Sequence, residues 1–266
     1  TVSERLSSLE DYYGARLFNR TTRALHLTEA GRTLLDGAPR LLAEAKELRA
    51  HIRSGAESLA GPLRISAPLD LGRERVAPIL DTFLERHPDI QAELVLLDGY
   101  SDMLADAVDI AVRFGSLPDS SLRVRRIGEN RRVVCAAPAY IEANGTPRTP
   151  AELTTHNCLC MRFGSALDRE WRFVDGDQTF TVRVTGDRLA NDGGLVRRWC
   201  LDGHGVALKS TWDVGDDLSA GRLVELLPTF APPADALQLV FPPGRRQPKR
   251  VVAFADALTQ ALLTPP

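Results

Sequence analysis

Apolar residues repeat at helical spacing in two stretches at the start of the chain. In the first, Val2, Leu6 and Leu9 mark one side of a short helix that is predicted to end at Gly14. In the second, apolar residues are separated alternately by four and three positions, which predicts one helix from residue 29 to about residue 53. The residues of this heptad seam are Leu34, Ala38, Leu41, Ala45, Leu48 and Ile52. Pro39 lies inside the helix and predicts a kink there or a division in two.

The segment between these helices, residues 17–31, predicts a short β-hairpin that forms a wing beside a helix. Arg20 and Arg23 would project from its tip, where guanidinium groups can reach phosphates or a narrow minor groove. The alternative is a solvated hairpin with surface arginines. Thr28 is expected to cap the following helix, with Glu29 in its first turn.

From residue 61 onwards, short apolar runs alternate with amphipathic stretches. A hinge bracketed by Ser54-Gly55 and Gly61-Pro62 precedes this region. Strands are predicted at residues 63–65, 90–97 and 108–112, with helices at 76–84 and 103–107 between them. Strands that alternate with helices favour right-handed parallel crossovers. We therefore predict a doubly wound α/β sheet.

The second half of the chain predicts another lobe. The continuously apolar run 133–137 is typical of a strand buried on both faces, and it would cross into that lobe. A hairpin at 171–184, a helix at 194–201 and a strand at 205–208 follow, before a return strand at 237–241 and a last helix at 251–263 on the first lobe. Two lobes joined by two strands predict a cleft. Residues 123–132 contain five arginines, for which a solvated edge strand is preferred to a nucleic-acid patch.

Composition narrows the functional classes. The 266 residues carry a net charge of −2, so no global field attracts nucleic acid and any DNA contact needs a local patch. Residues 1–32 contain five arginines against four acidic residues, so a DNA interface there would depend on geometry. No signal peptide or membrane-length apolar run occurs in the sequence, which favours the cytoplasm.

Candidate chemistry is sparse. The chain has no nucleophile elbow, Walker loop or GxGxxG motif, so we expect no enzyme, and we expect no cofactor. Four cysteines (Cys135, Cys158, Cys160 and Cys200) lack metal-binding spacing, and we expect buried reduced thiols and no metal. Redox sensing at the Cys158-Leu159-Cys160 segment is the alternative to two small buried side chains.

Several segments resemble the LysR-type transcriptional regulators. The N-terminal match looks like the second half of their winged helix-turn-helix and comprises Val2, Ser3, Leu9-Glu10, Gly14, Arg16-Leu17-Phe18, Arg20 and residues 28–31. Segments 62–68, 108–115, 133–140, 191–207 and 221–227 are similar to their effector-binding domain. Glu4 and Tyr13 depart from the family pattern, which usually has a basic or neutral residue and Leu.

The resemblance implies a regulator of transcription that binds double-stranded DNA and a small-molecule effector. In the family two helices precede this segment, so we expect a fragment or a chain trimmed at its start. The heptad helix would pair with its copy in a homodimer or homotetramer, in preference to packing on its own domain. A two-lobed solute-binding protein without DNA-binding activity is the alternative, although it would be exported and would lack the N-terminal helices.

The implied organisation is α/β with four parts. We expect a partial winged helix-turn-helix at 1–28 and a linker or dimerisation helix with its hinge at 29–61. Lobe I would comprise 62–136 and 240–266, and lobe II 137–239. Both lobes would be doubly wound, as in type 2 periplasmic binding proteins.

Candidate site residues follow from these expectations. The expected DNA contacts are Thr1, Ser3, Arg5, Arg20, Thr21, Thr22 and Arg23. The expected effector contacts are mainly at carboxyl ends of strands, and they are Ser66, Ala67, Pro68, Tyr100, Ser101, Phe114, Gly115, Arg162, Asn191 and Gly203. Arg162 favours a carboxylate effector, although Asp98, Asp102 and Asp192 nearby would repel one. The alternative is ordinary loop chemistry, with Arg162 paired to Asp168 or Glu170.

Overall fold

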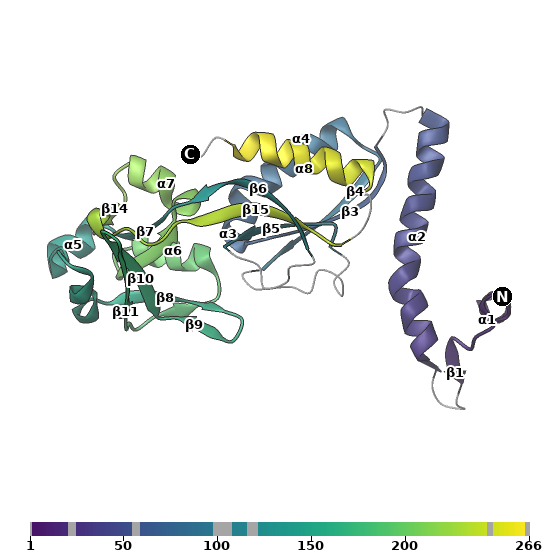
Figure 1. The fold of residues 1–266 in the computed structure, drawn as a ribbon, viewed down its shortest axis with the longest axis horizontal. Helices are drawn as coiled ribbons and strands as arrows, with labels where there is room; N and C mark the ends of the chain where they lie inside the picture. The colour runs from purple at the N-terminus through teal and green to yellow at the C-terminus, as the bar shows by residue number, and fades with distance from the viewer. Residues whose placement is uncertain are drawn as a thin grey trace. The chain divides into compact units, whose positions relative to one another are not determined.

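The computed structural model describes residues 2–20, 25–54, 59–97, 108–115, 122–243 and 247–263. The chain forms two compact units, residues 1–62 and residues 63–266, which are described separately (Figure 1). No helix in these described ranges is long and apolar enough to cross a membrane.

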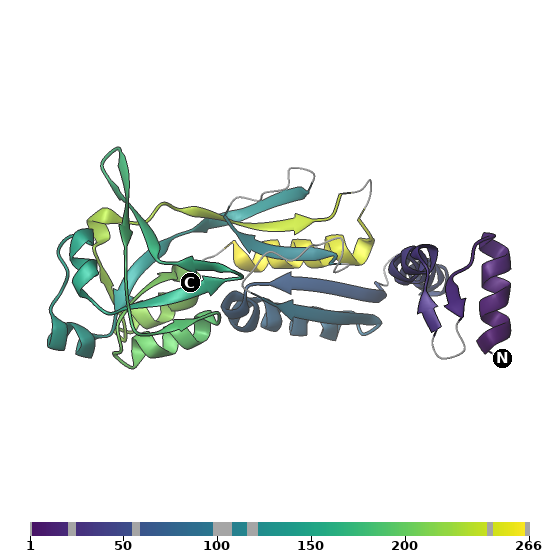
Figure 2. The same cartoon turned by 90° about the horizontal axis from the view of Figure 1, so that it is seen from below.

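The N-terminal unit consists of a helix, a hairpin and a long helix. Helix α1 (Val2–Tyr13) is followed by strands β1 (Phe18–Arg20) and β2 (Leu25–Leu27), which pair antiparallel, as Figure 2 shows. Helix α2 (Glu29–Ser54) continues through Pro39 as one element, so the expected division in two is wrong. One missing N–H group leaves the remaining hydrogen bonds of a 26-residue helix in place.

Thr28 fixes the junction between the hairpin and α2. Its Oγ1 accepts a 3.0 Å hydrogen bond from the backbone N–H of Gly31 and donates one of 2.7 Å to the carbonyl of Arg16. This confirms the predicted helix cap. Gly31 is required here, because a Cβ atom at this position would overlap with the carbonyl oxygen of Leu17.

Lobe I contains a five-stranded sheet in the order β4-β3-β5-β15-β6. The strands are β3 (Gly61–Ala67), β4 (Ile90–Leu96), β5 (Ile110–Phe114), β6 (Arg123–Asn130) and β15 (Asp235–Phe241). Strands β3 and β5 are parallel as predicted, whereas β15 runs antiparallel to β5 and β6. Strand β6 is an edge strand, as preferred from the sequence, and its Arg125 pairs with Asp256 at 2.6 Å.

Helices cover one face of this sheet. A short α3 (Leu69–Leu71) continues into a π-helical turn η1 (Gly72–Val76) and helix α4 (Ala77–Arg86). Helix α8 (Lys249–Leu262) lies beside α4, with the rings of Phe83 and Phe254 5.0 Å apart (Figure 1). The expected helix at 103–107 lies outside the described residues.

Lobe II contains a six-stranded sheet in the order β12-β8-β13-β7-β14, with β9 paired to β8. Its strands are β7 (Arg132–Ala136), β8 (Cys158–Phe163), β9 (Ala166–Asp168), β12 (Leu189–Ala190), β13 (Val206–Ser210) and β14 (Val224–Leu226). Strands β10 (Glu170–Asp175) and β11 (Gln178–Arg183) form the predicted hairpin. The helical elements are α5 (Pro138–Asn144), η2 (Pro150–Thr155), α6 (Gly193–Leu201), α7 (Thr211–Ser219) and η3 (Pro228–Phe230).

Strand β7 is buried on both faces, as its apolar run predicted. Val134 packs in a cluster with Trp171 on one side of the sheet, and Val133 packs with Val196 on the other. The same sheet corrects the expected lobe boundaries, because β7 belongs to lobe II and the whole of β15 to lobe I. An apolar run identifies a buried strand, but it does not identify the sheet with which that strand pairs.

Candidate DNA-binding and effector sites

Helix α1 presents its polar residues to solvent. Ser3 and Arg5 are exposed, and no residue described in this helix is buried. Arg20 ends strand β1, while Thr1, Thr21, Thr22 and Arg23 lie outside the described residues.

Glu10 joins α1 to the wing, and sequence reasoning missed this role. Its Oε1 atom accepts hydrogen bonds from the backbone N–H groups of Leu17 at 2.7 Å and Phe18 at 3.1 Å. Leu17 is buried beside it. The only sequence signal was an acidic residue on a helix that precedes a strand, which is too common to assign a partner.

The described part of the α2 seam is open to solvent. Leu34 and Ala38 are half-buried, and Leu41 has 61% of its surface exposed. Leu35 and Leu42 beside the seam are exposed as well. The side chains of Leu48 and Ile52 lie outside the described residues. A row of exposed leucines on one helix is typical of an interface with another chain.

The strand ends of lobe I bring several expected effector residues together. Ser66 and Ala67 end the buried strand β3, and Pro68 follows it. Phe114 ends the parallel neighbour β5, and Gly115 follows that strand. Gly115 has a φ angle of +78°, and its carbonyl accepts a hydrogen bond from Gln238. Tyr100 and Ser101 lie outside the described residues.

Arg113 is a buried cation at this edge that sequence reasoning missed. Its Nη2 donates a 2.7 Å hydrogen bond to Ser66 Oγ, and its Nη1 donates to the carbonyl of Val112. Ser66 pairs with Ala111 across the two strands, so Ser66 and Arg113 share a sheet face. The period-two pattern of β5 could have predicted this face, but not the neighbouring strand.

Asn191 and Arg162 of lobe II follow neighbouring positions of two paired strands, because β12 runs parallel to β8 with Ala190 opposite Met161. Asn191 is exposed at the start of α6, where Asp192 caps the helix by accepting from Leu195 N at 3.1 Å. Arg162 is exposed in β8, and Asp168 pairs with Arg132 at 3.0 Å.

Gly203 does not join the other effector residues, which corrects that expectation. It follows the opposite end of α6 from Asn191, and a Cβ atom there would lie 3.8 Å from Ala139 Cβ. Its φ of +78° suits a glycine that ends a helix.

The two lobes contact each other next to these strand ends. Asp70 and Arg73 of lobe I face Lys209 and Asp192 of lobe II, with ion pairs of 2.7 Å for Asp70–Lys209 and 3.4 Å for Arg73–Asp192. Asp192 has a lowered pKa: burial raises it, but hydrogen bonds from Leu195 N and Arg73 outweigh that effect.

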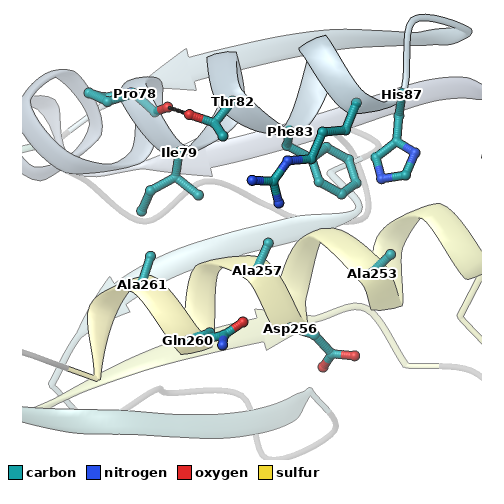
Figure 3. A pocket seen from close by; sticks show the side chains of 11 residues that line it. Pro78, Ile79, Thr82, Phe83, His87, Ala253, Asp256, Ala257, Gln260 and Ala261 are labelled. Carbon is teal, nitrogen blue, oxygen red and sulfur yellow. Dashed lines mark hydrogen bonds between the residues drawn. The ribbon is translucent and has the colours of Figure 1, made fainter.

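A separate groove of about 670 Å³ lies between α4 and α8 (Figure 3). Ile79 and Phe83 of α4 line it from one side, and Ala257 and Asp256 of α8 line it from the other. None of its lining residues is among the expected effector contacts. The groove is therefore distinct from the strand ends.

The four cysteines are free thiols and all of them are buried. Cys158 and Cys160 lie in the same apolar cluster as Trp171, which confirms two small buried side chains. Burial raises the pKa of Cys158 to about 12. No group of metal-binding side chains occurs in the described part of the chain.

A helix joined to a wing, a long helix with an exposed leucine seam, and two α/β lobes with facing strand ends define a ligand-responsive transcriptional regulator. The comparisons with known proteins agree. The family model described as "LysR substrate binding domain" matches residues 56–263, and "Bacterial regulatory helix-turn-helix protein, lysR family" matches residues 1–32. The chain belongs to the LysR family of transcriptional regulators.

Named relatives support this membership. The chain is 31% identical to the HTH-type transcriptional regulator DmlR of Escherichia coli, over 88% of this chain and 76% of that protein. It is 35% identical to the regulator CrgA of Neisseria meningitidis, over 85% of this chain and 75% of that protein. These relatives are regulators and not enzymes.

Solved structures show the same fold. CrgA from Neisseria meningitidis superposes with a TM-score of 0.71 at 31% identity, covering 98% of this chain and 88% of that chain. The Vibrio cholerae virulence activator AphB gives a TM-score of 0.67 at 28% identity, covering 97% and 88%. The match over residues 1–32 favours a DNA-binding regulator over a solute-binding module.

Proposed function

We propose that α1 and the wing contact double-stranded DNA and that a small carboxylate effector binds at the facing strand ends of the two lobes. The proposal of DNA binding rests on the hydrogen bonds that Glu10 accepts from Leu17 and Phe18. They hold the wing beside a helix whose polar residues are exposed. We propose that the regulator acts in the cytoplasm, which contains its DNA target.

The DNA contacts divide by chemistry. Ser3 and Arg5 would read base edges or phosphates in the major groove, with Thr1 at the helix start. Arg20 and Arg23 would contact phosphates or the minor groove from the wing, and Thr21 and Thr22 would donate to phosphate oxygens.

Dimerisation would use the α2 seam. A second copy of the helix would cover Leu34, Ala38 and Leu41, which are half-buried or exposed within the described unit. The dimer would then present two winged helices to a pseudo-palindromic site.

The effector part depends on cations at the strand ends. Arg113 is buried beside Ser66 in lobe I, and Arg162 is exposed in lobe II. Guanidinium groups bind carboxylates with paired hydrogen bonds. Six other expected contacts also lie at these strand ends or at the start of α6. They are Ser66, Ala67, Pro68, Phe114, Gly115 and Asn191.

A thermal-shift screen of the full chain against small aliphatic and aromatic carboxylates tests the effector site, because selective binding stabilises the folded state. Ser66→Ala and Arg162→Ala should each reduce the shift caused by an active carboxylate. Arg172→Ala, another exposed arginine of lobe II, is the matched control. Full shifts in both site variants would remove these residues from the site.

A further inference from the structure

Lys209 is a buried cation with three acceptors, and one of them comes from the other lobe. Its Nζ contacts Asp70 Oδ2 at 2.7 Å, the Gly193 carbonyl at 3.1 Å and Asp213 Oδ2 at 3.2 Å. Only 5% of the Lys209 side chain and 10% of the Asp70 side chain are exposed. Burial lowers the pKa of Lys209, but the carboxylates of Asp213 and Asp70 raise it by more, so the ammonium is charged at neutral pH.

Two glycines at the start of α6 make room for the Asp70 carboxylate. A Cβ atom at Gly193 would lie 2.5 Å from Asp70 Oδ2, and one at Gly194 would lie 2.9 Å from Asp70 Oδ1. The start of a helix also carries a partial positive charge. Lobe II thus combines a buried ammonium group with a space at the start of α6 that the Asp70 carboxylate occupies.

We propose that lobe II contains a carboxylate-binding site, formed by Lys209 and the start of α6, that lobe I fills with its own Asp70. A small carboxylate ligand replaces Asp70 in this site and thereby releases α3 of lobe I from lobe II. The link between this release and regulation rests on the proposed effector function. The site itself does not.

The other ion pairs between the lobes are weaker by geometry. Arg73–Asp192 and Arg75–Asp216 are both 3.4 Å long, and Arg73 and Asp216 are mostly solvent-exposed. Exposed pairs contribute little because water and salt screen them. Among the ion pairs described between the lobes, Asp70–Lys209 is therefore the shortest and the least exposed.

Chemical rescue of Asp70→Ala in the full chain tests the site without DNA or effector. Acetate supplies the missing carboxylate, so it should raise the Tm of this variant saturably, by about 2–4 °C more than chloride at equal ionic strength. Asp70→Ala/Lys209→Met lacks the ammonium and should show no acetate-specific rise. Asp216→Ala, which loses the exposed carboxylate of another pair between the lobes, should behave like wild type.

Equal effects of acetate and chloride on Asp70→Ala would overturn the proposal, as would an acetate response that persists in the double variant. If a variant is unfolded in chloride, acetate is added in the same way and the fraction of folded protein is measured by circular dichroism. Failure of acetate to restore the fold of Asp70→Ala then overturns the proposal. Loss of DNA binding or of effector shifts in other experiments would contradict the proposed function and leave this result unchanged.

Discussion

The backbone N–H of Leu17 donates a 2.7 Å hydrogen bond to the carboxylate of Glu10, and this contact connects helix α1 to the wing. The same carboxylate oxygen accepts from Phe18. One side chain therefore orients both parts of the DNA-binding region.

Glu10→Ala should loosen the wing. Hydrogen bonds to a charged group contribute more than neutral ones, so the loss should cost about 1–2 kcal/mol in the local opening of residues 17 and 18. Amide hydrogen exchange measures this opening directly. Asp11→Ala, at the neighbouring exposed position, is the control. Unchanged protection of both amides in Glu10→Ala would show that the contact is unimportant.

Replacing Leu41 and Leu48 by Asp should dissociate the protein into monomers, because charges would be buried against the partner helix. Light scattering gives the mass in solution. Thr33→Asp introduces a charge on another side of α2 and should leave the dimer intact. A double variant that stays dimeric would place the seam outside the subunit interface.

Local patterns predicted the elements well. The helical period of α1 and α2 and the apolar run of β7 depend on residues close in sequence, so each was visible before the structure. Burial on two faces leaves a sequence signal, because every side chain of the strand must be apolar.

Contacts between residues distant in the sequence could not be predicted from local patterns. Asp70 and Lys209 are 139 residues apart, and neither α3 nor β13 carries a pattern that names the other. The strand predicted at residues 108–112 stops short of Arg113, and its partner Ser66 lies on the neighbouring strand β3, 47 residues away in the sequence. Gly203 belongs to segment 191–207, which resembles the family, but its position beyond the far end of α6 separates it from Asn191.

Mild peroxide should leave the regulator unchanged. All four thiols are buried away from peroxide, and burial raises the pKa of Cys158 to about 12, so this residue is almost entirely protonated at neutral pH. Titration of free thiols before and after treatment should give the same count, with the same DNA affinity. Rapid loss of thiols from the folded protein would contradict this.

Asp217 should make stability depend on acid pH. Its side chain is 1% exposed and pairs with Arg197 and Arg222, both at 2.6 Å. Burial raises the pKa of Asp217, but the two arginines lower it by more. A carboxylate with a lowered folded-state pKa stabilises the protein above its unfolded pKa of about 3.9, and this stability is lost as pH falls through the folded value.

Asp217→Asn should therefore lose about 2 kcal/mol of unfolding free energy at pH 7, less than for fully buried pairs because both arginines reach solvent. The gap to wild type should narrow below about pH 4. Urea unfolding at both pH values measures it, with the exposed Asp216→Asn as control. A stability difference between the variant and wild type that does not change with pH would show that the ion pairs of Asp217 with the two arginines do not stabilise the protein.

The most direct test of DNA binding by α1 and the wing is the salt dependence of DNA affinity. In the intact protein, Arg20→Ala and Arg23→Ala should weaken binding to all sequences and reduce the slope of log affinity against log salt by about one for each lost phosphate contact. Arg172→Ala in lobe II should change neither quantity. Wild-type affinity and slope in both wing variants would contradict the assignment of the wing to DNA.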